Sequence, residues 1–156
     1  MGVHQLQFKL ELPIPIREAW DFFSHPKNLE LITPPDMKFK IVSNNLSENT
    51  YAGQMIKYNL QPITGIRVTW LTEITHVNSP YYFVDEQRKG PYKIWHHEHE
   101  FISSEQGIIM IDKLTYELPL GFLGEIANWL FVRKRMDAIF EYRREQLIKL
   151  FPDKKS

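Results

Sequence analysis

Apolar and polar residues alternate along much of the chain, which is typical of β-strands that bury one face. Phe8, Leu10 and Leu12 alternate with polar residues and predict a first strand over about 3–12. Between residues 37 and 118 the pattern recurs in further segments, which are separated by short stretches rich in Pro, Gly, Asn and Ser. It predicts six more strands, around 39–41, 55–60, 66–75, 81–88, 92–102 and 108–118, with a turn at 61–65.

Helical spacing of apolar residues appears in two other places. Ile16, Ala19, Trp20 and Phe23 predict a helix after the first strand, and Pro26 begins a second short helix that continues to about residue 32. The C-terminal part predicts a helix of roughly 28 residues, about 42 Å long and therefore able to cross a whole sheet. Its apolar stripe is expected to contain Ile126, Leu130, Met136 or Asp137, Phe140, Leu147 and Phe151.

This order of elements predicts an α+β fold. Six strands joined by tight turns form an antiparallel meander, and the C-terminal helix is the element long enough to cover its curved apolar face. We expect one domain over residues 1–156, with the sheet wrapped around the helix and an internal cavity between them.

Composition and charge narrow the class of protein. The chain has 19 Lys plus Arg against 19 Asp plus Glu, which argues against a general binder of nucleic acid or anionic membranes. It has no cysteine, so disulfides, thiolate metal sites and cysteine nucleophiles are excluded. The first residues do not look like a signal peptide, and no stretch resembles a membrane span. We expect a cytoplasmic protein that is a monomer or weak homodimer, with no stable membrane insertion.

Several motifs give the chain a resemblance to a known superfamily. The prolines at 13 and 15 lead into a helix, Gly90-Pro91-Tyr92 precedes Trp95-His96-His97-Glu98-His99-Glu100-Phe101, and residues 112–121 end in Leu118-Pro119-Leu120-Gly121. With these motifs the chain resembles the START-like, Bet v 1-like (SRPBCC) superfamily over nearly its full length, and within it a bacterial ligand-binding or polyketide-cyclase-like subgroup. The resemblance implies a helix-grip fold with a cavity and implies no cofactor.

The histidine-containing strand carries the most chemistry. In a strand, Trp95, His97, His99 and Phe101 point to one face, and the two flanking aromatic residues indicate that this face is the inner one. If residues 104–107 close a hairpin, facing positions sum to about 211. His99 then lies opposite Asp112, His97 opposite Leu114, and Trp95 opposite Tyr116.

Three interpretations of the two histidines remain open. They could be packed, hydrogen-bonded residues that join strands, or they could line the cavity and orient a polar group of an apolar ligand. They could also bind a metal with Asp112, although two histidines are a weak signal and we assign no metal. Asp85 and Gln87 share a face with Phe83 and are further candidates for the cavity, although the opposite face of that strand, with Tyr82 and Val84, is a rival.

We therefore predict a protein that binds a hydrophobic or amphipathic small molecule between the sheet and the C-terminal helix, without nucleic acid as a partner. One alternative is a cyclase, dehydratase or hydrolase acting on a polyketide-like or aromatic substrate, with His99 and Asp112 as the general base. Another is a non-catalytic module that binds a lipid or a protein partner. The predicted binding residues are Asp85, Gln87, Trp95, His97, His99, Phe101, Asp112, Leu114 and Tyr116.

Overall fold

The computed structural model describes residues 2–44, 46–63 and 65–153 of the 156-residue chain. The elements follow the predicted order of one strand, short helical segments, six strands and a long helical segment, with three short helical segments in place of the two predicted. They are β1 (His4–Leu12), α1 (Ile16–Phe23), the 3₁₀ helices η1 (Pro26–Ile32) and η2 (Pro35–Met37), β2 (Lys40–Ile41), β3 (Gln54–Ile63), β4 (Ile66–Asn78), β5 (Tyr82–Lys89), β6 (Ile94–Ser104), β7 (Gly107–Glu117), α2 (Phe122–Ala127), the π-helix η3 (Asn128–Val132) and α3 (Arg133–Leu150).

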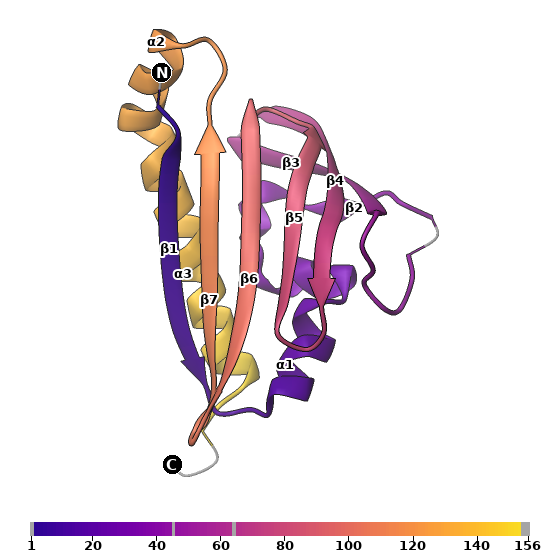
Figure 1. Cartoon of the computed structure of the whole chain (residues 1–156). Coiled ribbons are helices and arrows are strands. Elements are labelled where there is room, and N and C mark those ends of the chain that lie inside the picture. Colours follow the sequence, from indigo (N-terminus) through magenta and orange to yellow (C-terminus); the bar gives the residue numbers. More distant parts are fainter. Residues whose placement is uncertain (1, 45, 64, 154–156) are drawn as a thin grey trace.

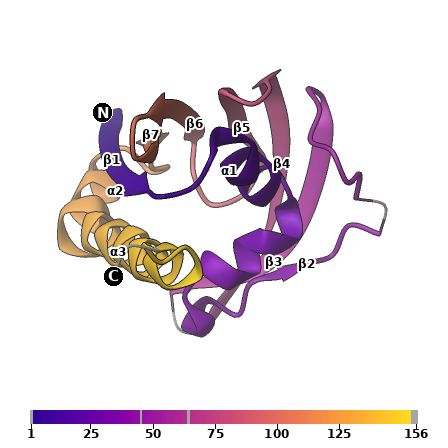
Figure 2. The ribbon, with the colours of Figure 1, turned by 90° about the horizontal axis from the view of Figure 1, so that it is seen from below.

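The seven strands form one antiparallel sheet in the order β1-β7-β6-β5-β4-β3-β2. From β2 to β7 each strand pairs with the next one along the chain, and β1 joins the far edge beside β7. Viewed end-on, the sheet curves strongly, and α3 lies across its open side (Figure 2). The α+β prediction of a curved antiparallel sheet around the C-terminal helix is therefore confirmed.

Helix α3 packs mainly on the half of the sheet formed by β1 and β7 (Figure 1). Phe140 stacks on Phe8 with ring centroids 3.8 Å apart, and Met136 joins Leu114 and Tyr116 in the same buried cluster. Burial of each such side chain contributes about 1.5–3 kcal/mol, so this contact fixes the helix on that side of the sheet.

A second apolar cluster closes the end of the molecule where α1 lies. Trp20 contacts the edges of Phe83 and Phe101, and Leu147 of α3 is fully buried in the same cluster. This cluster joins α1, the middle strands and the C-terminal part of α3. Trp20 is thus a core residue, as its position in the helical stripe predicts.

The structure differs from the prediction in two local features. Residues 61–63 were expected in a turn but extend β3, and the pairing with β4 shifts register between Leu60 and Ile63. Such a bulge lets one strand carry extra residues before the chain reverses. The second short helix forms, but as the 3₁₀ helix η1.

The predicted apolar stripe of the C-terminal helix is confirmed only in its second half. Met136, Phe140 and Leu147 are buried, whereas Ile126 and Leu130 are 40% and 45% exposed. Ile126 precedes the π-helix η3 and Leu130 lies within it; the turn of a π-helix is wider, so these residues are rotated relative to an ideal α-helical stripe. Within the described residues, no helix combines the length and the apolar character needed to cross a bilayer.

Candidate functional site

A pocket of about 1040 Å³ lies between α3, η1 and the half of the sheet that α3 does not cover. Its wall comes from β2 to β6, the helical segments before β2, and one face of η3 and α3. Most of the lining is apolar, including Ile56, Leu60, Trp70, Ile74, Phe83 and Ile139. The pocket exists on this side because α3 packs directly on β1 and β7 and stands away from β3 and β4.

A polar cluster interrupts the apolar wall at the middle of the sheet. It consists of Asp85 on β5 and His97 and His99 on β6, all of which line the pocket. Asp85 pairs with His97 in the ladder, and Phe83 pairs with His99. Because side chains alternate along each strand, this register places the three polar groups on the inner face.

Asp112 of β7 lies behind the two imidazoles and is only 1% exposed. Its Oδ1 atom is 2.9 Å from His97 Nε2 and 3.0 Å from His99 Nδ1, although only the first contact has good hydrogen-bond geometry. The predicted register, with His99 opposite Asp112, His97 opposite Leu114 and Trp95 opposite Tyr116, is confirmed.

Asp85 contacts the imidazoles from the pocket side. Its Oδ2 atom is 2.8 Å from His99 Nε2 and 3.5 Å from His97 Nδ1. Its other oxygen, Oδ1, is 3.4 Å from the indole Nε1 of Trp95, which donates to it. Each carboxylate therefore contacts both rings, Asp85 on one side and Asp112 on the other.

Arg143 of α3 completes the cluster. Its Nη1 atom is 3.7 Å from Asp112 Oδ1, and its guanidinium lies over the ring of Phe140 at 4.9 Å from the centroid. The side chain is only 11% exposed, so this cation is largely removed from solvent. Phe140 and Arg143 are one helical turn apart, which is why both face the sheet.

The pKa directions in the cluster follow from burial and pairing. Burial opposes ionisation of Asp112, but its contacts with the two imidazoles, chiefly the hydrogen bond from His97, outweigh it and hold its pKa far below the usual value. For Asp85, burial is likewise outweighed, chiefly by the bond from His99, and its pKa is also lowered. Burial and the charge of His99 lower the pKa of His97. For His99, bonds to Asp112 and Asp85 outweigh burial and raise its pKa.

The lowered pKa values of Asp85 and Asp112 favour their ionised forms. Their partners in the cluster are the imidazoles of His97 and His99 and the guanidinium of Arg143. Such pairing is what allows charged groups to remain inside an apolar wall.

Of the nine predicted binding residues, four line the pocket and five do not. Asp85, Trp95, His97 and His99 line it. Leu114 and Tyr116 lie under Met136 and Phe140, because α3 covers β7 directly. The residues outside the pocket lining are Gln87, Phe101, Asp112, Leu114 and Tyr116.

The other three have identifiable roles in packing and hydrogen bonding. Phe101 is 1% exposed beside Trp20 in the cluster under α1. Gln87 holds the β5–β6 turn, since its side chain donates to the carbonyl of Tyr92 and accepts from the Tyr92 amide. Asp112 supports the two histidines from behind. Asp85 thus lies on the inner face, whereas the side chain of Gln87 is hydrogen-bonded to the backbone of the β5–β6 turn.

Sequence reasoning missed three residues of the site: Arg143, Tyr58 and Trp70. Tyr58 lines the pocket and its hydroxyl is hydrogen-bonded to Thr72. Burial, followed by the nearby charge of Asp85, raises its pKa. Trp70 is buried, yet it also borders the pocket, and its indole Nε1 has no partner among the described residues. Tyr58 lies on β3 and Trp70 on β4, so the alternation of side chains along these two strands is the signal that could have placed both residues on the pocket side of the sheet.

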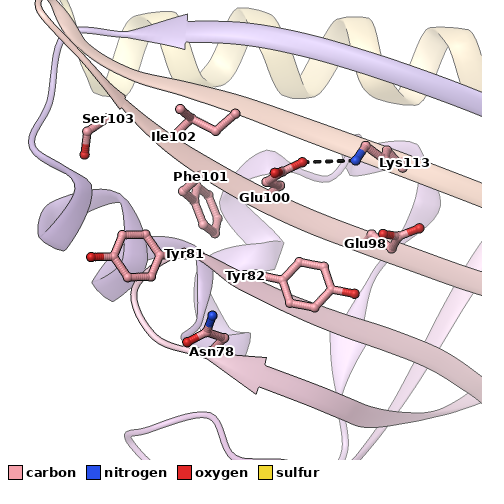
Figure 3. Close-up of a pocket in the computed structure, with 9 residues that line it drawn as sticks. All are labelled: Asn78, Tyr81, Tyr82, Glu98, Glu100, Phe101, Ile102, Ser103 and Lys113. Atoms are coloured by element: carbon pink, nitrogen blue, oxygen red, sulfur yellow. Dashed lines mark hydrogen bonds and ion pairs between the residues drawn. The ribbon is translucent and has the colours of Figure 1, made fainter.

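A second hollow, of about 550 Å³, lies on the outer face of the sheet (Figure 3). Glu98 and Glu100 of β6 border it, and Lys113 bridges to Glu100 at 3.0 Å. It is bordered by the exposed Tyr81, the half-buried Tyr82 and charged groups, and it lacks the apolar enclosure of the first pocket. The polar cluster and the larger apolar pocket on the inner face therefore form the candidate site.

Comparison with known proteins gives matches to solved structures. No protein-family model matches the sequence, and no curated protein matches it. Protein Ms6760 from Mycobacterium smegmatis is 16% identical, with a TM-score of 0.65, covering 96% of this chain and 98% of the other. The protein TTHA0849 from Thermus thermophilus is 17% identical, with a TM-score of 0.64, covering 94% and 99%.

Ara h 8.0201 is a further match at 15% identity, with a TM-score of 0.62, covering 95% of this chain and 99% of the other. Identities this low carry information about the fold and not about the ligand. The coverage extends over nearly the whole of each chain, so the likeness concerns the complete architecture. The chain has the Bet v 1-like helix-grip fold, as its sequence motifs indicated.

Proposed function

We propose that this protein binds an apolar or amphipathic small molecule in the pocket beside α3. The observation that carries the proposal is a pocket of about 1040 Å³ with an apolar wall and one concentrated polar cluster. Small-molecule sites commonly have volumes of about 300–1,000 Å³ and a few polar groups that fix orientation. The pocket combines these two properties.

The lining indicates the chemistry of the ligand. An apolar body fits against Ile56, Leu60 and Ile139, while a polar group at one end meets Asp85, His97 or His99. Those three residues present both hydrogen-bond donors and acceptors. A hydroxyl, carbonyl or carboxylate on a largely hydrophobic skeleton is the type of molecule that satisfies both regions.

The test is to fill the pocket without disturbing the sheet. Ala138 lines the pocket and its side chain is exposed, so Ala138→Phe adds a ring at the pocket wall. Glu145→Phe is the matched control, because it adds the same ring to an exposed position of α3 outside the pocket. Binding of the fluorescent probe 1-anilinonaphthalene-8-sulfonate is measured by titration. We expect roughly tenfold weaker binding in Ala138→Phe, equivalent to about 1.4 kcal/mol, and unchanged binding in the control.

Equal probe binding in both variants and the unchanged protein would contradict the proposal, since the probe would then bind elsewhere. Native mass spectrometry of protein purified from its own host gives an independent readout. We expect a small molecule to co-purify with the unchanged protein and to be depleted in Ala138→Phe.

An enzyme is a second candidate, favoured by the imidazoles of His97 and His99 between a pocket and a buried carboxylate. A cyclase, dehydratase or hydrolase acting on a polyketide-like or aromatic substrate could use one imidazole as a general base, with Asp112 orienting it. His99→Ala and Asp112→Asn would then retain the co-purifying molecule but stop its conversion over time. If the mass of the bound molecule never changes with the unchanged protein, the binding function alone remains.

A further inference from the structure

We propose that Asp85, His97 and His99 form a binding site for a divalent transition-metal cation of the zinc type in the wall of the pocket. One potential ligand atom from each residue lies within 4.8 Å of the others. This inference goes beyond the binding of a small molecule and does not depend on it. The third ligand is Asp85 of β5, and not Asp112 of β7.

The inner atoms of the three residues converge. Asp85 Oδ2 is 2.8 Å from His99 Nε2 and 3.5 Å from His97 Nδ1. In a tetrahedral site with bonds of about 2.1 Å, neighbouring ligand atoms are about 3.4 Å apart. These two separations bracket this value, and the ligand atoms of the two histidines lie within 4.8 Å of each other, so the three atoms converge on one point from which side-chain movement can admit the cation.

The outer atoms are held as metal-binding histidines require. A metal-ligating imidazole generally gives its other nitrogen to a carboxylate or carbonyl, which fixes the ring. Here Asp112 lies beside both rings: its Oδ1 atom is hydrogen-bonded to His97 Nε2 at 2.9 Å and is 3.0 Å from His99 Nδ1, a contact without good hydrogen-bond geometry. Asp85 is supported in the same way, since Trp95 Nε1 donates to the oxygen that faces away from the histidines.

The position also suits a reactive or ligand-binding metal. Asp85, His97 and His99 all line the pocket, while Asp112 does not, so the free coordination position of the metal faces the cavity. Three protein ligands with one open position are typical of catalytic zinc sites. A cation there would supply a Lewis acid that binds the polar group of the ligand, and Arg143 would keep the charge of Asp112 compensated.

The experiment uses the full chain and the metal alone. Co²⁺ is titrated into the protein and visible absorption bands are recorded, after which Zn²⁺ is added in competition. We expect one equivalent of Co²⁺ to produce the bands and Zn²⁺ to remove them. Asp85→Asn is expected to weaken binding roughly 100-fold, because it replaces a charged ligand by a neutral amide of similar shape.

His96→Gln is the matched control. His96 lies on the opposite face of β6, 2.8 Å from Glu86 and 3.7 Å from Glu98, and forms a more exposed histidine–carboxylate group. The proposal requires unchanged Co²⁺ binding in this variant. It is overturned if His96→Gln abolishes binding, or if the unchanged protein binds neither metal more tightly than about 1 mM, a weak affinity of about −4.1 kcal/mol.

X-ray absorption at the zinc edge decides the question should Asp85→Asn fail to fold. The unchanged protein with one equivalent of Zn²⁺ should show nitrogen or oxygen ligands at about 2.0–2.1 Å and the scattering pattern of two imidazoles. A spectrum with one imidazole or none would overturn the site. Because no small molecule is present in any arm, failure here leaves the proposed ligand-binding function to its own test.

Discussion

The two halves of the C-terminal helical segment differ in how far their apolar side chains are buried. In α3, Phe140 and Leu147 are 7% and 0% exposed. In the α2–η3 half, Phe122, Leu123 and Trp129 are between 64% and 81% exposed. Both halves contain large apolar residues, so hydrophobicity alone did not decide which of them is buried.

The difference lies in what each half can reach. Helix α3 lies along the strands β1 and β7, whereas α2 lies near the N-terminal end of β1, at the end of the sheet (Figure 1). Polar contacts hold the α2–η3 half in place. Glu125 accepts from the Gly2 amide at 2.9 Å, and Tyr116 donates to Asn128 at 2.7 Å. Apolar burial fixes one half of the segment, and a small set of hydrogen bonds fixes the other.

Substitution of one aromatic residue in each half gives the largest contrast. Phe140→Ala removes a ring that stacks on Phe8, and we expect it to lower the free energy of unfolding by about 3–5 kcal/mol. Trp129→Ala removes a larger ring that is 81% exposed, and we expect a change within about 0.5 kcal/mol. Urea unfolding followed by circular dichroism measures both. Similar losses in the two variants would show that the halves are equally packed.

Two adjacent arginines provide a second, smaller contrast within α3. Arg143→Met leaves Asp112 without its cationic neighbour in a buried position, and we expect a loss of about 1–3 kcal/mol. Arg144→Met removes an exposed contact with Glu141, and we expect less than about 0.5 kcal/mol. The same unfolding measurement applies. Equal effects would mean that Arg143 does not serve the polar cluster.

The sequence predicted the fold well because local patterns determine it. The alternation at Phe8, Leu10 and Leu12 located β1, and the hairpin at residues 104–107 fixed the register of β6 and β7. Counting outward from that hairpin was enough to place His99 opposite Asp112. The turn between β3 and β4 was harder to predict, because a bulge does not alter the apolar pattern in a recognisable way.

The site was predicted only in part, because its shape depends on where α3 lies. The inner face of β6 was identified correctly, and His97 and His99 on that face line the pocket. However, alternation cannot tell which part of an inner face the helix will cover. Leu114 and Tyr116 face inward as expected, yet α3 packs on them, and the pocket opens beside β3 and β4 instead. Arg143 was not among the predicted binding residues, although its spacing from Phe140 places both side chains on the same face of α3.

The polar attachment of the α2–η3 half predicts a small pH effect. The hydrogen bond from the Gly2 amide, assisted by His4, lowers the pKa of Glu125 from its ordinary value of 4.5. A carboxylate with a lowered pKa in the folded state stabilises above its ordinary pKa, and this contribution disappears as the pH falls through the lowered value. The link between β1 and α2 should therefore persist down to pH 4.5 and weaken below it.

Nuclear magnetic resonance can follow this link through the amide signal of Gly2. We expect its chemical shift to titrate with a midpoint below 4.5, and the titration to vanish in Glu125→Gln. Glu18, an exposed glutamate of α1, provides the comparison variant, and Glu18→Gln should leave the Gly2 signal unchanged. A Gly2 midpoint at or above 4.5 would show that the hydrogen bond does not favour the ionised form of Glu125. Polar contacts could then not account for how α2 is held while its apolar side chains stay exposed.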